Sequence, residues 1–194
     1  PLEETLEALG ELVKQGKVRQ IGLSNETPWG TMKYLELAET KSLPRVASIQ
    51  NAYNLVNRGF EIGLSEVAMH EQVGLLAYSP LAQGTLTGKY LGGQMPQGSR
   101  LALFGDGPLM MRYKGDKTQQ AIEMYVNLAK KYEIDPAQLA IQFCNIQPFV
   151  TSTIIGATTM EQLKTCIDSV DLDITKEIMN EIRGIHKEIP NPAP

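Results

Sequence analysis

The chain has 194 residues, of which 42% are hydrophobic and 21% are charged, and its formal net charge at pH 7 is -4. These fractions are typical of a folded globular protein and exclude a disordered chain. The acidic balance, without a run of Lys or Arg, argues against nucleic acid and anionic membranes as partners and favours small molecules. No apolar run is long enough to span a membrane and no signal-peptide pattern opens the chain, so we expect a cytoplasmic protein.

The sequence contains two cysteines, Cys144 and Cys166. Their spacing is not that of metal ligands, and two cysteines are too few for a disulfide framework. We therefore expect reduced thiols and no metal site, with Cys144 in the core.

Alternating helices and strands are predicted for the first 80 residues from the hydrophobic period and the turn residues. Thr27 and Pro28 form a helix start signal, because Pro suits the first helical position after a Thr cap. Met32, Leu35 and Ala38 would form the inner face of that helix. The other predicted helices cover residues 2–15 and 60–72, and the predicted strands cover residues 18–23, 46–50 and 74–78.

The segment 81–115 is rich in Gly and Pro and is far longer than an ordinary connection in an α/β protein. Loops of this length are usually functional, so we expect an active-site and cofactor loop. Beyond it, a strand is predicted over residues 153–155, and His186 near the end of the last helix is expected to face solvent. The predicted helices of this part cover residues 117–132, 136–146, 160–169 and 175–186.

Strands that alternate with helices in this rhythm predict parallel βαβ units in one structural unit, residues 1–194. Four such units would form an open sheet with two exposed edges, which complete folds avoid. A doubly wound dinucleotide fold would show G-x-G-x-x-G after its first strand, and Ile21-Gly22-Leu23-Ser24-Asn25 lacks that motif. The predicted fold class is therefore α/β, half of a (β/α)8 TIM barrel, with about four βα units and additional helices.

Residues 154–163 predict an apolar strand that runs through a turn of small residues directly into a capped helix. The first amide groups of a helix have no internal partners and its dipole is positive there, so a phosphate is stabilised at such a junction. Gly156 leaves room for the phosphate, Thr158 offers a hydroxyl, and Thr159 with Gln162 has the spacing of a capping box. The alternative is a turn that is capped in the same way and binds nothing.

In a (β/α)8 barrel the active site lies at the carboxyl ends of the strands. Here those ends carry Ser24, Asn25, Gln50 and Tyr78. The hydroxyl and the two amides suit a carboxamide, and Tyr78 offers a flat face for an aromatic ring, so together they suit nicotinamide. Taken singly, the same residues could be a turn, a polar strand end and a core ring.

Three of these stretches resemble the aldo-keto reductase superfamily, and the resemblance covers the whole chain. They are residues 21–25, the run Ala77-Tyr78-Ser79-Pro80-Leu81, and residues 156–163. Within that family, residues 24–27 and 84–90 and the last three residues are similar to the bacterial Tas-type reductases.

The resemblance implies NADP(H)-dependent reduction of an aldehyde or ketone, with this chain as the carboxyl-terminal half of a (β/α)8 barrel. The cofactor would lie extended across the barrel mouth. For Arg100, a solvated loop charge is the alternative interpretation. The implied contacts are Ser24, Asn25 and Gln50 to the carboxamide, Tyr78 to the nicotinamide ring, Ser79, Pro80, Leu81 and Gly84 to the pyrophosphate, Lys89 and Arg100 to the phosphates, and Gly156, Thr158 and Gln162 to the 2′-phosphate and adenosine.

Two departures from the family pattern affect these expectations. Thr165 and Cys166 stand where the family commonly has Glu and Asn contacting adenosine, so a weaker cofactor affinity is expected. The family's Asp, Tyr, Lys and His tetrad lies on strands before the helix at which this chain begins, so we expect a longer protein and no catalytic residue here. Tyr53 could line the pocket. The alternative function is a non-catalytic NADP(H)-binding or interaction subunit, or an inactive fragment, and the oligomeric state stays open.

Overall fold

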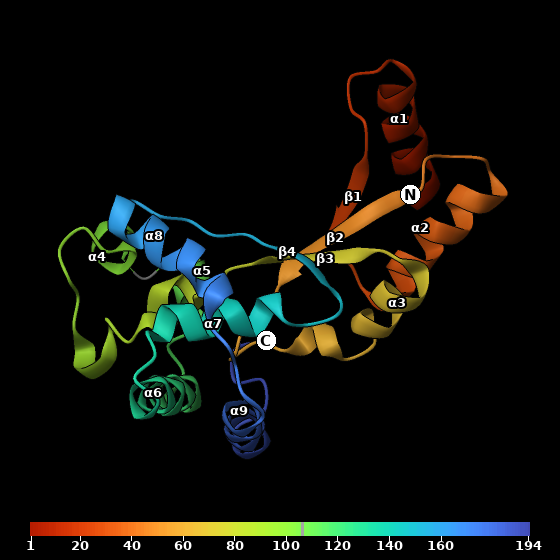
Figure 1. The fold of residues 1–194 in the computed structure, drawn as a ribbon. Coiled ribbons are helices and arrows are strands. Elements are labelled where there is room, and N and C mark those ends of the chain that lie inside the picture. Colours follow the sequence, from red (N-terminus) through yellow and green to blue (C-terminus); the bar gives the residue numbers. More distant parts are fainter. Residues whose placement is uncertain (106) are drawn as a thin grey trace.

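Four parallel strands form a single sheet in the order β1-β2-β3-β4 (Figure 1). The structure is a computed structural model, and it describes residues 1–105 and 107–194. The strands are β1 (Ile21–Ser24), β2 (Val46–Ala52), β3 (Gly74–Tyr78) and β4 (Val150–Thr153). Sequential order with parallel pairing requires a crossover between successive strands, as in half of an α/β barrel. The predicted fold class is confirmed.

Helices follow each strand, and several of the described helices begin at a side-chain cap. The side-chain oxygens of Thr27, Asp135, Thr159 and Thr175 accept hydrogen bonds from amide groups in the first turns of their helices. In Figure 1, α1 to α3 gather beside β1 to β3, and α6 lies beside α9, against which it packs. The long helices are α1 (Leu2–Lys14), α2 (Pro28–Thr40), α3 (Leu64–Glu71), α6 (Asp116–Lys131), α7 (Pro136–Asn145), α8 (Met160–Asp168) and α9 (Lys176–Glu188).

The segment 81–115, expected as a loop, contains a series of short helices. Two of them, Ala82–Thr87 and Leu91–Gly93, are 3-10 helices, and α4 (Arg100–Phe104) and α5 (Pro108–Met111) follow. Its far end is anchored, because Tyr113 is buried. The segment is therefore attached to the body of the protein at both ends.

Two predicted strands have different bounds in the structure. The strand expected at 18–23 begins at Ile21, and the one expected at 153–155 is β4, Val150–Thr153. The strand at 153–155 was predicted too late in the chain because hydrophobicity favoured the apolar pair Ile154 and Ile155 over the polar Thr and Ser residues before it. Ladder pairing with Leu75–Ala77 selects the earlier, β-branched residues instead.

Two predicted helices also differ from the structure. The helix expected at 60–72 is divided into a 3-10 turn, Gly59–Glu61, and α3, because Gly63 between them has a φ of +86°. In α2 the buried face is rotated by one residue from the face that the sequence predicts. Met32 is 42% exposed, and Thr31 and Tyr34 are buried together with Leu35 and Ala38.

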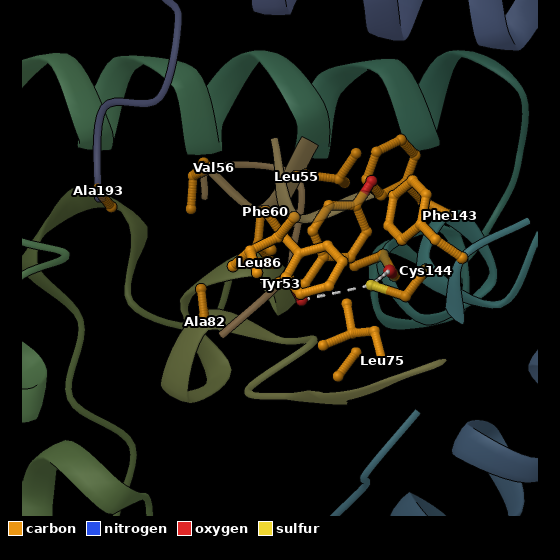
Figure 2. Close-up of a cluster of buried hydrophobic side chains, with 14 of the residues drawn as sticks. Tyr53, Leu55, Val56, Phe60, Leu75, Ala82, Leu86, Phe143, Cys144 and Ala193 are labelled. Carbon is orange, nitrogen blue, oxygen red and sulfur yellow. Dashed lines mark hydrogen bonds between the residues drawn. The ribbon is translucent and has the colours of Figure 1, made fainter. Parts of the chain in front are cut away.

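Aromatic rings fill the centre of the core (Figure 2). The ring of Tyr53 stacks on that of Phe143 at 5.8 Å between centroids and meets the edge of Phe149 at 5.3 Å. Cys144 lies in this cluster, fully buried, with Sγ 3.5 Å from the carbonyl oxygen of Tyr53. The prediction that Cys144 belongs to the core is confirmed, and burial raises the pKa of its thiol.

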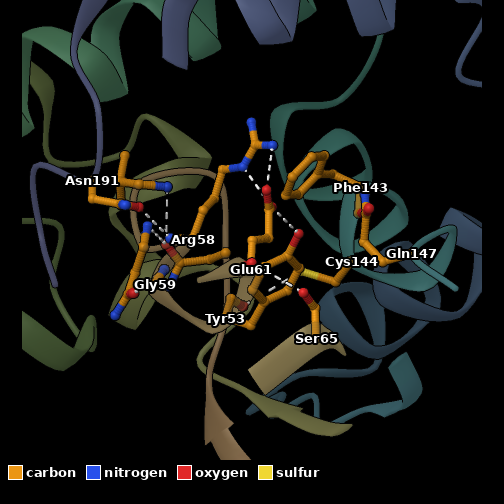
Figure 3. Close-up of polar contacts among 12 residues, drawn as sticks. Tyr53, Arg58, Gly59, Glu61, Ser65, Phe143, Cys144, Gln147 and Asn191 are labelled. Atoms are coloured by element: carbon orange, nitrogen blue, oxygen red, sulfur yellow. Dashed lines mark hydrogen bonds and ion pairs between the residues drawn. The ribbon is translucent and has the colours of Figure 1, made fainter. Parts of the chain in front are cut away.

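A polar network borders the aromatic core (Figure 3). Arg58 donates two hydrogen bonds to Glu61, from Nε to Oε1 at 2.6 Å and from Nη2 to Oε2 at 2.8 Å. The hydroxyl of Tyr53 donates to the same Oε1 at 2.6 Å. Burial opposes ionisation of Glu61, but the bonds from Arg58 and Tyr53 outweigh it, so the pKa of Glu61 is lowered. The carboxyl-terminal tail closes over this network, where Asn191 Oδ1 accepts the Arg58 amide at 2.8 Å.

His186 borders the same network and is not the solvent-exposed residue expected from the sequence. It is half-buried, and among the described residues its Nδ1 is buried without a hydrogen-bond partner. Burial and the charge of Arg58 lower its pKa, and Glu61 opposes this only in part. The last turn of α9 packs against the connection between β2 and α3. The hydrophobic pattern of α9 alone does not predict this contact.

We expect the folded protein to lose stability on mild acidification because of His186. Its pKa in the folded protein lies below the ordinary value of about 6.5, so the unfolded chain binds more protons just below that pH. The stability contributed by the neutral ring is complete above about pH 6.5 and is lost as the pH falls below it. Urea unfolding at pH 7.5 and at pH 5.5, each about one unit from that value, should show a lower free energy at the acid pH, and His186→Phe should reduce the difference. The same substitution at exposed His70 is the control; a pH response unchanged by His186→Phe would contradict the assignment.

Candidate functional site

Polar side chains at the ends of β1, β2 and β3 meet in one group. The hydroxyl of Tyr78 donates to Asn25 Oδ1 at 2.9 Å, and Asn25 Nδ2 donates to Ser24 Oγ at 3.3 Å. The Asn25 amide donates to the carbonyl of Gln50 at 3.1 Å, and Ser24 is in register with Gln50. Ser24, Asn25 and Gln50 are exposed. The structure therefore brings together the four residues expected at the nicotinamide, and their binding role stays a prediction.

Asn51 belongs to this group although the sequence analysis did not select it. Its Oδ1 accepts the backbone amide of Asn25 at 2.8 Å. Asn25 has a φ of +53°, a left-handed conformation that few residues other than Gly and Asn adopt readily. Asn51 therefore helps to hold the residue after β1 in this left-handed conformation. Its position one residue after Gln50 was the only available signal.

A tight turn follows β3, built from several residues in the left-handed region. The φ angles of Ser79, Ala82, Gln83 and Gly84 are +54°, +48°, +60° and +90°. Such backbone is costly for residues other than glycine and is common at sites that bind ligands. The turn is closed by hydrogen bonds from the Ala82 amide to Ser79 O at 2.9 Å and from the Gly84 amide to Leu81 O at 2.8 Å. We call residues 79–84 the β3 turn.

Two cations lie at the β3 turn. Arg100 Nη1 donates to Gln83 Oε1 at 2.6 Å, and Gln83 Nε2 donates to Ser79 Oγ at 2.9 Å. A Cβ placed on Gly84 would lie 3.0 Å from Lys89 Nζ, so this ammonium group rests directly against the turn. Gln83 was missed by the sequence analysis, because only the fold reveals that it joins Arg100 to Ser79. The structure thus unites Lys89 and Arg100 with the expected pyrophosphate segment.

The turn before α8 differs in detail from the prediction. Because β4 ends at Thr153, six residues rather than the expected four separate it from the helix. Thr159 Oγ1 accepts the Gln162 amide at 3.2 Å, as expected of a capping box, but Gln162 Oε1 accepts from the amide and hydroxyl of Thr158 at 3.0 and 3.1 Å. Gly156 and Thr158 are exposed. Among the described residues, no hydrogen bond links this turn to the β3 turn.

Thr165 and Cys166, which replace the expected Glu and Asn, lie where α8 packs against α7. Cys166 is 6% exposed, and burial raises the pKa of its thiol. The carbonyl oxygen of Thr165 accepts from Gln138 Nε2 at 3.4 Å. The Cys166 side chain therefore serves helix packing.

No group of three or more His, Cys, Asp or Glu side chains within residues 1–105 and 107–194 could hold a metal ion. No helix in that part of the chain is both long enough and apolar enough to cross a membrane.

Comparison with known proteins gives consistent matches. A model of the aldo/keto reductase family matches residues 1–187. Protein tas of Escherichia coli (strain K12) is 51% identical over 193 residues, which cover 100% of this chain and 55% of that protein. An aldo-keto reductase of Babesia bovis is 41% identical over 96% of this chain and 67% of its own length, and the L-glyceraldehyde 3-phosphate reductase of E. coli (strain K12) is 34% identical over 88% and 50%. The chain spans about half the length of most of these relatives.

Proposed function

Because this chain belongs to the aldo/keto reductase family, we propose that it supplies the NADP(H)-binding part of an oxidoreductase that reduces a small aldehyde or ketone. The observation that carries the proposal is the chain of contacts from Arg100 through Gln83 to Ser79, next to the group formed by Tyr78 and Asn25. Cationic and amide donors next to an aromatic ring suit a dinucleotide, in which phosphates adjoin a flat carboxamide-bearing ring.

Each part of the cofactor has a matching set of groups in this proposal. Tyr78 stacks on the nicotinamide, and the amides of Asn25 and Gln50 bind its carboxamide. The β3 turn with Lys89 and Arg100 binds the pyrophosphate. The turn formed by Gly156, Thr158 and Gln162 binds the 2′-phosphate, as a helix amino terminus suits an anion. The bound cofactor supplies the hydride, and the role of this chain is to orient it.

The sequence allows Tyr53 to line the pocket. Its surroundings in the structure exclude it as a proton donor for the substrate. It is fully buried, and its hydroxyl donates to Glu61 at 2.6 Å. Burial and the neighbouring carboxylate raise its pKa. In the proposed enzyme, the proton for the carbonyl oxygen therefore does not come from Tyr53.

The test is carbonyl-dependent consumption of NADPH by the full-length protein, measured over a panel of small aldehydes and ketones. Turnover with at least one of them supports the reductase. Binding of NADPH without turnover of any carbonyl would favour the non-catalytic binding subunit, and absence of NADPH binding would contradict both. Aldehydes that carry a phosphate, compared with their unphosphorylated analogues, would further define the substrate class.

A further inference from the structure

Asn54 lies just beyond β2, and both the oxygen and the nitrogen of its side chain make hydrogen bonds. It is 0% exposed. Its Oδ1 accepts the amides of Val56 at 3.0 Å and Asn57 at 2.9 Å. Its Nδ2 donates to Ser79 O at 2.9 Å. An asparagine side chain has two donors and two acceptor sites, so these three bonds use both acceptor sites and one donor.

The bond to Ser79 joins two segments that lie 25 residues apart in the sequence. The β2–β3 ladder reaches the bond from the Tyr53 amide to Tyr78 O at 3.3 Å. The carbonyl group of the next residue, Ser79, accepts a hydrogen bond from the side chain of Asn54 and not from a backbone amide of the β2 segment. Asn54 therefore fixes the first residue of the β3 turn relative to the sheet.

We propose that Asn54 is a positioning residue for cofactor binding, which acts through Ser79 by holding the β3 turn in the shape that receives the pyrophosphate. Ser79 has a φ of +54°, and such backbone persists only where its surroundings fix it. Its carbonyl oxygen is held by Asn54 on one side and by the Ala82 amide at 2.9 Å on the other. Loss of the Asn54 donor leaves this turn free to relax.

Asn57 provides a matched control in the same connection. It is 6% exposed, and its amide and carbonyl pair with those of Asn54. Its side-chain oxygen accepts only a local bond, from the Gly59 amide at 3.3 Å. Among the described residues its side chain makes no hydrogen bond to the β3 turn. Replacing it perturbs the connection while leaving the Ser79 contact in place.

The test rests on the proposed function and uses Asn54→Asp in the full-length protein. The carboxylate keeps the acceptors for Val56 and Asn57, whose bonds favour its charged form, and removes both donors. We expect the dissociation constant for NADPH to rise about tenfold, because the Ser79 carbonyl loses a buried partner. Adenosine 2′,5′-bisphosphate, which lacks the pyrophosphate bridge, should change by less than about twofold.

Asn57→Ala should leave both dissociation constants near those of the unmodified protein. If Asn54→Asp does not fold, Asn54→Ser is the second variant, because its hydroxyl can cap the local turn but is too short to reach Ser79. Equal weakening of both ligands, or no weakening of NADPH, would overturn the positioning role. Failure of the unmodified protein to bind NADPH would instead contradict the proposed function, so the two failures are distinguishable.

Discussion

The double substitution Lys89→Ala and Arg100→Ala weakens NADPH binding about a hundredfold, on the proposal that both cations face the pyrophosphate. Each removes one charge-assisted contact, and each contact accounts for about a factor of ten. The two cations lie at the same turn, Arg100 through Gln83 and Lys89 against Gly84. Titration of the full-length variant with NADPH, followed by cofactor fluorescence, measures the effect.

The control removes the same charge from another part of the surface. Arg183 and Lys187 are exposed on α9, and their replacement by alanine changes the net charge by the same amount. If a general surface potential attracted the cofactor, both double variants would weaken binding equally. That outcome would contradict the proposal that the β3 turn binds the pyrophosphate. An effect confined to Lys89 and Arg100 places the phosphates there.

Glu61→Gln lowers the free energy of unfolding by about 2–3 kcal/mol, because it leaves the partly buried Arg58 without a countercharge. The side chains of Arg58 and Glu61 are 13% and 28% exposed, so solvent relieves part of the penalty and the lower end of the usual range applies. The substitution also takes the ionised acceptor from Tyr53. Urea unfolding of the variant and the unmodified protein at neutral pH measures the difference.

Glu11→Gln is the matched control for this prediction. Glu11 and Lys14 are three residues apart in the sequence, as are Arg58 and Glu61, but their side chains are 59% and 70% exposed. Ion pairs at such exposure add little to stability, so the control should unfold like the original protein. Equal effects of the two substitutions would show that burial of the Arg58 network adds nothing.

Local patterns predicted the elements whose sequence carries both a period and a boundary signal. Strand β3 has the predicted bounds, and α2 begins at its Thr27 and Pro28 signal. Strand β4 was misplaced because edge pairing, and not hydrophobicity, selects Val150–Thr153. His186 was misjudged because contact with the Arg58 network depends on how α9 packs.

In the candidate site too, local sequence patterns predicted some residues, and others depend on tertiary contacts. Residues of the expected types were found at the strand ends, since parallel strands place their carboxyl ends together. The residues that support them, Asn51, Asn54 and Gln83, are ordinary polar residues in the sequence. Their contacts with Asn25, Ser79 and Arg100 join segments separated by 17 to 26 residues. No spacing rule predicts such bonds, which depend on the sheet register and on the path of the 81–115 segment.

The central claim is that the β3 turn and the turn before α8 together bind NADP(H). The most direct measurement is a titration of the full-length protein with NADPH and with NADH under the same conditions. The account predicts saturable binding of NADPH about tenfold or more tighter than that of NADH, because only NADPH carries the 2′-phosphate. Equal affinity for NADPH and NADH would contradict the role of the turn before α8 in binding the 2′-phosphate. No binding of either would contradict the cofactor site as a whole.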